Sequence, residues 1–186
     1  MKVIFLDRDG TMGGNGGGVA PDKFQLFKQT IPAIRLLNQN GYVVMIVTNQ
    51  SRISRGYFTE EEFIKETNKL LSVLKENKAE IKDYFYCPHY NEECKCHKPD
   101  IGMIQEAYSR YPSINFQQSY FIGDNGSSDM MCAQNAGIKK ILVKTGWGVS
   151  SLTTHRHLWK DIEPDKVVKN ISEAAEWIVQ NEKFNR

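Results

Sequence analysis

The sequence predicts a doubly wound α/β fold in which helices cover both faces of a parallel sheet. Short apolar runs alternate along the chain with stretches of helical periodicity, and several runs end directly in acidic or polar side chains. Central parallel strands are buried on both faces and are therefore nearly continuous apolar runs. With 186 residues, 40% apolar and 25% charged, the chain is predicted to form a single domain over 1–186.

The first half of the chain contains two such strands, each followed by a helix. Residues 2–7, "KVIFLD", form one apolar run, and residues 42–49, "YVVMIVTN", form a second. Between them, apolar residues at helical spacing predict a helix over 31–40. Thr59 and the glutamates after it match a capping box, which predicts a helix over about 60–78.

The second half repeats the alternation. Strands are predicted at 83–87 ("DYFYC"), at 119–124 ("SYFIGD") and at 139–146 ("KKILVKTG"). The remaining helices are predicted at 100–111, 128–135 and 171–181.

The composition argues against several classes of partner. The net charge of +2 gives no electrostatic reason to expect nucleic acid or an acidic membrane as partner. No segment approaches the roughly 18 apolar residues of a membrane span, and the N-terminal apolar run is too short for a signal peptide. We therefore expect a cytoplasmic monomer that binds neither nucleic acid nor membrane.

Polar side chains far apart in the sequence follow the predicted strands. Asp7 and Asp9 follow the first strand, Thr48 ends the second, and Asp124 ends another. Because ligands bind at the carboxyl ends of strands in open α/β sheets, these groups are predicted to meet at one edge. Carboxylates suit Mg²⁺, and together with a hydroxyl and the cation Lys98 they suit phosphoryl transfer.

A cluster of cysteine and histidine precedes this lysine. Cys87, His89, Cys94 and Cys96 offer three thiolates and one imidazole in the loop 87–96, a common donor set for structural Zn²⁺. Free thiols and a disulfide are the alternatives, although cysteines one residue apart are a poor fit for a mutual disulfide. His97 is a further candidate ligand, but its position beside the lysine favours a place in the active site.

Four motifs resemble those of the haloacid dehalogenase-like (HAD) phosphatases, in the same order and over nearly the whole chain. They are "FLDRDGT" at 5–11, "VTNQS" at 47–51, "HKP" at 97–99 and "IGDNGSSD" at 122–129. The resemblance implies a Rossmann-like sheet and catalysis through an aspartyl-phosphate.

Carried over to this sequence, the resemblance also implies roles for individual residues. Asp7 would attack phosphorus and Asp9 would act as general acid and base. Thr48 would bind the transferring phosphoryl group, and Lys98 would steady both that group and the nucleophile. Asp124 would hold Mg²⁺ together with the Asp7 carboxylate and the backbone carbonyl of Asp9.

The intervals between the motifs leave no room for a cap domain. In the families that this chain resembles, caps are inserted between the first two motifs or between the second and third. Here each interval holds one predicted helix with a loop or strand. The resemblance is therefore to the capless subclass IIIA, whose specificity comes from loops around an open site.

Within that subclass the chain is similar to bacterial D-glycero-D-manno-heptose 1,7-bisphosphate phosphatases and histidinol-phosphate phosphatases. Their "NQSGIARG" corresponds here to "NQSRISRG", so Arg55 matches and Arg52 replaces a glycine. His97 stands where the family usually has arginine, and Asn125 where heptose phosphatases have a basic residue. We expect Asn49, Arg55, His97 and Asn125 to contact substrate.

The leading interpretation is a Mg²⁺-dependent phosphatase of a small phosphorylated sugar, with heptose 1,7-bisphosphate as the favoured substrate. The alternatives are a phosphatase of histidinol phosphate or another phosphomonoester, a polynucleotide 3′-phosphatase, and a non-catalytic binding module stabilised by zinc. The modest charge argues against the polynucleotide substrate. The intact set of motif residues argues against the non-catalytic module.

Overall fold

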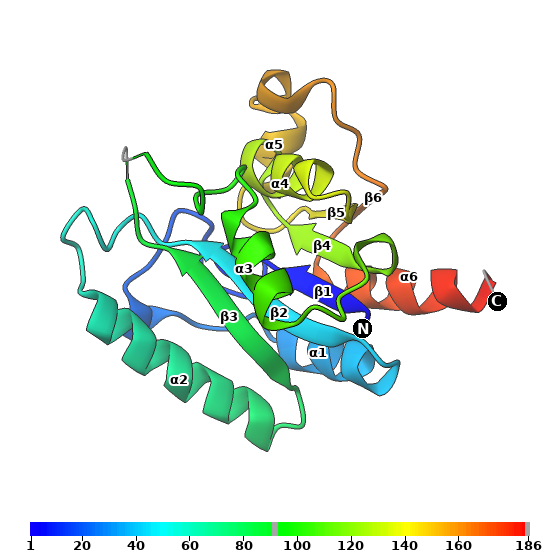
Figure 1. Cartoon of the computed structure of the whole chain (residues 1–186), viewed down its shortest axis with the longest axis horizontal. Coiled ribbons are helices and arrows are strands. Elements are labelled where there is room, and N and C mark those ends of the chain that lie inside the picture. The colour runs from blue at the N-terminus through cyan, green and yellow to red at the C-terminus, as the bar shows by residue number, and fades with distance from the viewer. Residues whose placement is uncertain (91–92, 185–186) are drawn as a thin grey trace.

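Six parallel strands form one sheet in the computed structural model, which describes residues 1–90 and 93–184. The strand order is β3-β2-β1-β4-β5-β6 (Figure 1). β1 is therefore paired with β2 on one side and with β4 on the other. β2 and β3 are added on one side of β1, and β4 to β6 are added on the other. The strands are β1 (Val3–Leu6), β2 (Val43–Asn49), β3 (Ile81–Cys87), β4 (Tyr120–Gly123), β5 (Lys139–Val143) and β6 (Lys166–Val168).

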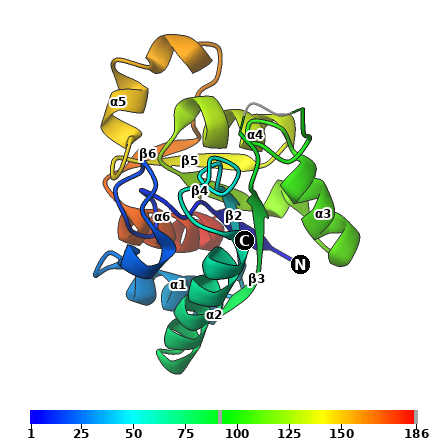
Figure 2. The ribbon, with the colours of Figure 1, turned by 90° about the vertical axis from the view of Figure 1, so that its left-hand side faces the viewer.

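Helices cover both faces of the sheet, as predicted (Figures 1 and 2). The helices are α1 (Thr30–Gln39), α2 (Glu60–Glu76), α3 (Gly102–Arg110), α4 (Met131–Asn135), α5 (Gly148–Leu152) and α6 (Ile171–Phe184). Side chains of α1, α2 and α6 belong to one apolar cluster, and those of α3 and α4 belong to a second on the opposite face. The doubly wound α/β prediction is confirmed.

The strands at the centre of the sheet are apolar on both sides because β1, β2 and β4 contribute to both clusters. In β1, Ile4 and Leu6 pack in the cluster of α1 and α6, whereas Val3 and Phe5 pack in the cluster of α3. All four are fully buried. Burying a side chain of this size stabilises the fold by about 1.5–3 kcal/mol. This placement explains why the segment lacks the apolar–polar alternation of a half-exposed strand.

Capping residues in the sequence correctly predicted where helix α2 begins. The capping box of α2 is formed, with the Glu62 amide donating to Thr59 Oγ1 (3.1 Å) and the Thr59 amide donating to Glu62 Oε2 (2.7 Å). Other ends differ from prediction. The strand predicted to reach residue 146 ends at Val143, because the chain turns before Gly146, whose φ is +53°. The helix predicted at 128–135 starts earlier, as a π-helical turn over Gly126–Met130.

Among the strands and α-helices of the described residues, β6 and α5 were not predicted. β6 has three residues and forms through its pairing with β5 at the sheet edge, so it has no periodicity of its own to detect. α5 has five residues and ends in the turn at Thr153.

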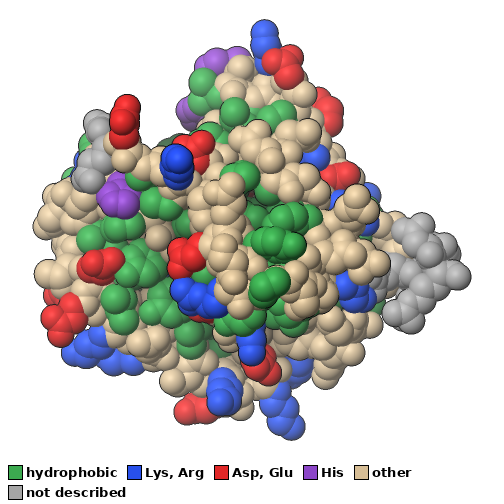
Figure 3. All heavy atoms as spheres, viewed as in Figure 1, with side chains coloured by type: hydrophobic (Ala, Val, Ile, Leu, Met, Phe, Trp, Pro, Cys, Tyr) green, Lys and Arg blue, Asp and Glu red, His purple; other side chains and the backbone are tan. Residues whose placement is uncertain are grey.

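The surface carries charges of both signs. On the face shown in Figure 3, Lys and Arg side chains are interspersed with Asp and Glu, and apolar side chains are visible between them. Among the helices described, none has both the length and the apolar character needed to cross a membrane.

Candidate active site

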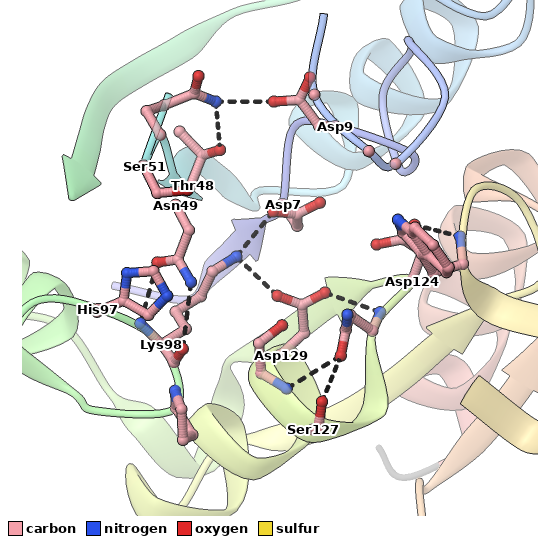
Figure 4. A pocket seen from close by; sticks show the side chains of 18 of the residues that line it. Asp7, Asp9, Thr48, Asn49, Ser51, His97, Lys98, Asp124, Ser127 and Asp129 are labelled. Carbon is pink, nitrogen blue, oxygen red and sulfur yellow. Dashed lines mark hydrogen bonds and ion pairs between the residues drawn. The ribbon is translucent and has the colours of Figure 1, made fainter. Parts of the chain in front are cut away.

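A cavity of about 480 Å³ opens at the carboxyl ends of β1, β2 and β4. Ligand sites in open α/β sheets lie where the strand order reverses, which here is between β1 and β4. The cavity brings together most of the predicted site residues, namely Asp7, Asp9, Thr48, Asn49, His97, Lys98, Asp124 and Asn125. Figure 4 labels these residues except Asn125 and shows their side chains converging from separate segments.

Lys98 lies at the base of the cavity with all three ammonium hydrogens engaged. Its Nζ donates to Asp7 Oδ1 (2.7 Å), Asp129 Oδ1 (2.6 Å) and the Val47 carbonyl (2.9 Å). Burial alone would lower the pKa of Lys98, but the two carboxylates outweigh it and raise that pKa above its usual range. The side chain is therefore a fixed positive charge between two carboxylates (Figure 4).

Asp7 is one of the two carboxylates that contact this charge. Besides the Lys98 bond, its Oδ2 accepts a hydrogen bond from Thr11 Oγ1 (3.2 Å). Burial raises the pKa of Asp7 to about 7; Lys98 opposes this shift and Asp129 adds to it. One ammonium group therefore does not by itself keep Asp7 fully ionised, and a further positive charge would lower its pKa.

Asp124 completes a group of three carboxylates. Oxygens of Asp7, Asp124 and Asp129 all lie within 4.8 Å of one another. Burial raises the pKa of Asp124 to about 9, with the negative charges of Asp7 and Asp129 as the next causes. Three buried carboxylates facing one ammonium group leave an excess of negative charge. A divalent cation with oxygen coordination would balance it.

The hydrogen bonds indicate which carboxylates are available to such a cation. Both Asp129 oxygens accept hydrogen bonds: Oδ1 from Lys98 Nζ, and Oδ2 from the backbone amide of Asn125 (3.0 Å). Asp124 uses one oxygen to accept from the Trp147 amide (2.7 Å). The donor set therefore fits Mg²⁺ held by Asp7 and Asp124, with Asp129 committed to Lys98. Ligation by the Asp9 carbonyl stays a prediction.

Two glycines pack directly against the Asp124 carboxylate. A Cβ atom at Gly10 would lie 2.1 Å from Asp124 Oδ2, and one at Gly146 would lie 2.0 Å from the same oxygen. Both residues have positive φ values, +91° and +53°. Backbone alone can approach the carboxylate this closely.

Asp9 is held by two residues that the sequence reasoning missed. Its Oδ2 accepts from Arg8 Nη1 (2.9 Å) and from Gln50 Nε2 (2.7 Å), and Gln50 Nε2 also donates to Thr48 Oγ1 (3.0 Å). Asp9 Oδ1 is buried and has no hydrogen-bond partner among the described residues. The Asp9 carboxylate is therefore oriented through Oδ2. A signal was present, because an arginine directly after a buried strand needs a partner.

Arg8 itself is buried against aromatic side chains. It is 2% exposed, and its guanidinium carbon lies 3.6 Å from the centre of the Phe24 ring. Its position is therefore set by packing as well as by Asp9.

Asn49, predicted to contact substrate, holds the backbone of Lys98. Asn49 Nδ2 donates to the Lys98 carbonyl (3.1 Å), and the Lys98 amide donates to Asn49 Oδ1 (3.0 Å). The end of β2 is thus tied to the segment that carries the catalytic cation. Thr48 lines the cavity, is 1% exposed, and accepts its hydrogen bond from Gln50.

The remaining predicted substrate contacts divide into two groups. His97 and Asn125 line the cavity. Burial and then the charge of Lys98 lower the pKa of His97, so its imidazole is neutral at pH 7. Arg55 is not among the described cavity-lining residues; it is exposed, with its guanidinium over the rings of Tyr57 (5.1 Å) and Tyr90 (4.6 Å).

The four predicted zinc ligands come together beside the active site. One ligand atom from each of Cys87, His89, Cys94 and Cys96 lies within 4.8 Å of all the others. Cys87 Sγ is 3.7 Å from Cys94 Sγ and 3.0 Å from Cys96 Sγ, and His89 Nδ1 is 3.2 Å from Cys96 Sγ. Ligands on a tetrahedral Zn²⁺ lie roughly 3.5–3.8 Å apart, given its bond lengths. All the cysteines are free thiols, and the donor set fits zinc.

His97 is close to this cluster as well, since its Nδ1 lies 3.7 Å from Cys87 Sγ. It therefore lies between the metal-ligand cluster and the cavity. Cys132, the fourth cysteine of the chain, is buried in α4, away from the cluster.

The chain is similar to known phosphatases. Residues 95–174 match the HAD-hydrolase-like family model. A D-glycero-beta-D-manno-heptose-1,7-bisphosphate 7-phosphatase of Haemophilus ducreyi is 39% identical over 160 residues, 81% of this chain and 87% of the relative. A D-glycero-alpha-D-manno-heptose-1,7-bisphosphate 7-phosphatase of Photorhabdus laumondii is 36% identical over 163 residues, 82% of this chain and 88% of the relative.

A solved structure is similar over the whole chain. It is the D,D-heptose 1,7-bisphosphate phosphatase from B. bronchiseptica, complexed with magnesium and phosphate. The two chains have a TM-score of 0.86 and 28% sequence identity, and the match covers 97% of this chain and 99% of that one.

Proposed function

The chain belongs to the heptose-1,7-bisphosphate 7-phosphatase family of HAD-like hydrolases, and from this membership we propose that it hydrolyses the 7-phosphate of D-glycero-D-manno-heptose 1,7-bisphosphate. One observation carries the proposal. The Asp7 carboxylate is buried 2.7 Å from Lys98 Nζ, in the same cavity as Asp9, Thr48 and Asp124. This arrangement supplies a nucleophile, an acid, a phosphoryl-binding hydroxyl and a metal ligand for phosphoryl transfer.

The first half of the reaction transfers the phosphoryl group to the protein. An oxygen of Asp7 attacks phosphorus, the bond from phosphorus to the sugar oxygen breaks, and Asp9 gives its proton to that leaving oxygen. Lys98 stays beside the nucleophile and stabilises the charge on the phosphoryl oxygens. The products are an aspartyl-phosphate on Asp7 and the free sugar hydroxyl.

The second half releases phosphate. Asp9, now ionised, accepts a proton from water as the water oxygen attacks phosphorus. The bond between phosphorus and Asp7 breaks, which regenerates the carboxylate and frees inorganic phosphate. Arg8 and Gln50 hold Asp9 Oδ2 and so orient the carboxyl group that gives and takes the proton.

The donor sets fit two metal ions, one catalytic and one structural. Asp7 and Asp124 would hold Mg²⁺, which when bound supplies positive charge for the phosphoryl oxygens. Cys87, His89, Cys94 and Cys96 would hold a structural Zn²⁺, with all four tetrahedral positions taken by protein.

The cellular setting forms part of the proposal. We propose a cytoplasmic monomer whose partner is a small phosphorylated sugar and neither nucleic acid nor membrane. The net charge of +2 and the mixed charges on the face in Figure 3 support this, because polynucleotide binding calls for a basic surface.

A substrate screen tests the activity. Phosphate release with Mg²⁺ is measured on both anomers of heptose 1,7-bisphosphate, histidinol phosphate, a 3′-phosphorylated oligonucleotide and p-nitrophenyl phosphate. We expect the largest kcat/KM on a heptose bisphosphate. A larger value on histidinol phosphate would reassign the substrate, and no release from any of them would overturn the phosphatase function.

The nucleophile is tested separately. Asp7→Asn removes the attacking oxygen anion and should abolish turnover while the protein remains folded. Radiolabelled phosphate from the substrate should be trapped on wild-type protein by acid quenching and absent from the variant. Turnover by the variant at the wild-type rate would exclude the aspartyl-phosphate route.

A further inference from the structure

The reaction described above does not use Arg52, a positively charged side chain that lines the cavity. Among the described residues that line it, Lys98 and Arg52 carry fixed positive charges. Lys98 has no hydrogen left to donate, because Asp7, Asp129 and the Val47 carbonyl take all three. Any additional anionic group of a ligand therefore has Arg52 as its available cation.

Arg52 is held in place, but not by polar partners. Its guanidinium carbon lies 5.0 Å from the centre of the Tyr57 ring. Within the described part of the chain, the Arg52 side chain has neither a hydrogen bond nor an ion pair. A half-buried guanidinium stacked on an aromatic ring keeps its five N–H donors for a ligand and loses little side-chain freedom on binding.

The glycine-rich loop after β1 places backbone beside this arginine. Gly16, Gly17 and Gly18 line the cavity. A Cβ atom at Gly18 would lie 3.0 Å from Arg52 Nε, and one at Gly16 would lie 2.5 Å from Trp147 Cδ1. The loop thus runs from Trp147 to Arg52 with no side chains on these three residues, which leaves the guanidinium accessible from the cavity.

We propose that Arg52 binds the substrate's second phosphate, the one that is not transferred, and so selects a bisphosphate over a monophosphate. The proposal rests on the proposed function, because it takes the ligand to be a sugar bisphosphate. A guanidinium matches phosphate in a bidentate arrangement. The four carboxylates of the cavity would repel a second phosphate that had no cation of its own.

Arg55 provides a matched control. It lies three residues further along the same turn and is also stacked on Tyr57, but it is outside the cavity. The variants are Arg52→Ala, Arg52→Lys and Arg55→Ala, and their melting temperatures are compared with that of wild type. Each variant is assayed on heptose 1,7-bisphosphate and on heptose 7-phosphate, which lacks the second phosphate.

We expect Arg52→Ala to lower kcat/KM about 10- to 100-fold more on the bisphosphate than on the monophosphate, as loss of a charged hydrogen bond would. The effect should be in KM, with kcat little changed. Arg52→Lys should recover part of it, because lysine keeps the charge but not the bidentate geometry. Equal losses on both substrates, or a selective loss in Arg55→Ala in place of Arg52→Ala, would overturn the proposal.

The proposed function can fail separately. It fails if the wild-type protein hydrolyses p-nitrophenyl phosphate but neither anomer of heptose 1,7-bisphosphate. Arg52 is then tested by competition, with fructose 1,6-bisphosphate and fructose 6-phosphate as inhibitors of p-nitrophenyl phosphate hydrolysis. An inhibition constant that rises in Arg52→Ala for the bisphosphate alone supports the role, and equal changes for both sugars overturn it.

Discussion

Replacing Cys96 with serine tests whether the zinc cluster both stabilises the protein and positions its catalytic cation. Cys96 Sγ lies 3.0 Å from Cys87 Sγ and 3.2 Å from His89 Nδ1, so it is central to the cluster. Lys98 follows two residues later. We expect the Cys96→Ser protein to lose zinc, to melt at lower temperature and to turn over more slowly.

The size of the stability loss follows from the loop that the metal closes. Zinc would link Cys87, at the end of β3, to Cys96. Closing a loop of about ten residues removes roughly 2.5–3 kcal/mol of chain entropy from the unfolded state. For a domain of this size each kcal/mol shifts the melting temperature by about 2–4 °C, which gives a decrease of roughly 5–12 °C.

The catalytic loss should be partial, because other contacts still hold Lys98. Its Nζ has three hydrogen bonds, and Asn49 holds its backbone on both sides. A displacement of about 1 Å can cost about 100-fold in rate, so we expect kcat to fall roughly 10- to 100-fold.

Three measurements decide the matter: zinc content by mass spectrometry, thermal melting by circular dichroism, and phosphate release at saturating Mg²⁺. Cys132→Ser is the matched control. The Cys132 thiol is buried in α4 and donates to the Asp100 carbonyl (3.4 Å), a bond that serine can replace. The control should keep one zinc and full turnover. If the Cys96→Ser protein has lost its zinc but has the melting temperature and turnover rate of wild type, the cluster neither stabilises the protein nor positions Lys98.

Three further predictions concern the cavity. Asn49→Ala removes both hydrogen bonds to the Lys98 backbone and should lower kcat about 10- to 100-fold, with an unchanged kcat counting against this role. Burial raises the pKa of Asp124 from 3.8 to about 9 in the folded protein. Between these two values the folded, magnesium-free protein keeps a proton on Asp124 that the unfolded chain has released. Its stability should therefore decrease as the pH rises toward 9. Its melting temperature should fall between pH 6 and 9, and excess Mg²⁺ should flatten the dependence; a flat profile without Mg²⁺ would contradict the shift. Gly146→Ala should weaken Mg²⁺ activation at least tenfold, because the new Cβ would displace Asp124. Gly137→Ala is the control, since Gly137 also has a positive φ (+67°) but no atom lies within 4 Å of the new Cβ. It should lower only the stability of the protein, by about 1 kcal/mol.

The strands that carry the site could be predicted because their signal is local. The apolar runs of β1, β2, β4 and β5 reflect burial on two faces. Asp7 and Asp124 directly follow β1 and β4, and Thr48 lies near the end of β2. β6 lacked such a signal, since three residues form a strand only through their partner.

Individual side chains were harder to place. The two arginines of "NQSRISRG" are three positions apart in a turn with no helical or strand period to assign them to a face. The resemblance favoured Arg55 as a substrate contact, but the structure has Arg52 in the cavity and Arg55 over Tyr57 and Tyr90. Both arginines pack on the nearby Tyr57, and the contact that distinguishes Arg55 is with Tyr90, which lies on a segment far along the chain.

The sequence by itself determined the sheet, the edge at which the polar residues meet, and the donor sets for both metals. These follow from periodicity, from the polar residue types found at strand ends, and, for zinc, from four ligands close together in one loop. Only the tertiary structure decided how the charges at that edge are distributed: Lys98 shared by Asp7 and Asp129, Asp9 held by Arg8 and Gln50, and Arg52 left without a polar partner among the described residues. Hydrogen bonds and ion pairs between distant segments depend on distances of a few tenths of an ångström, which no local pattern encodes.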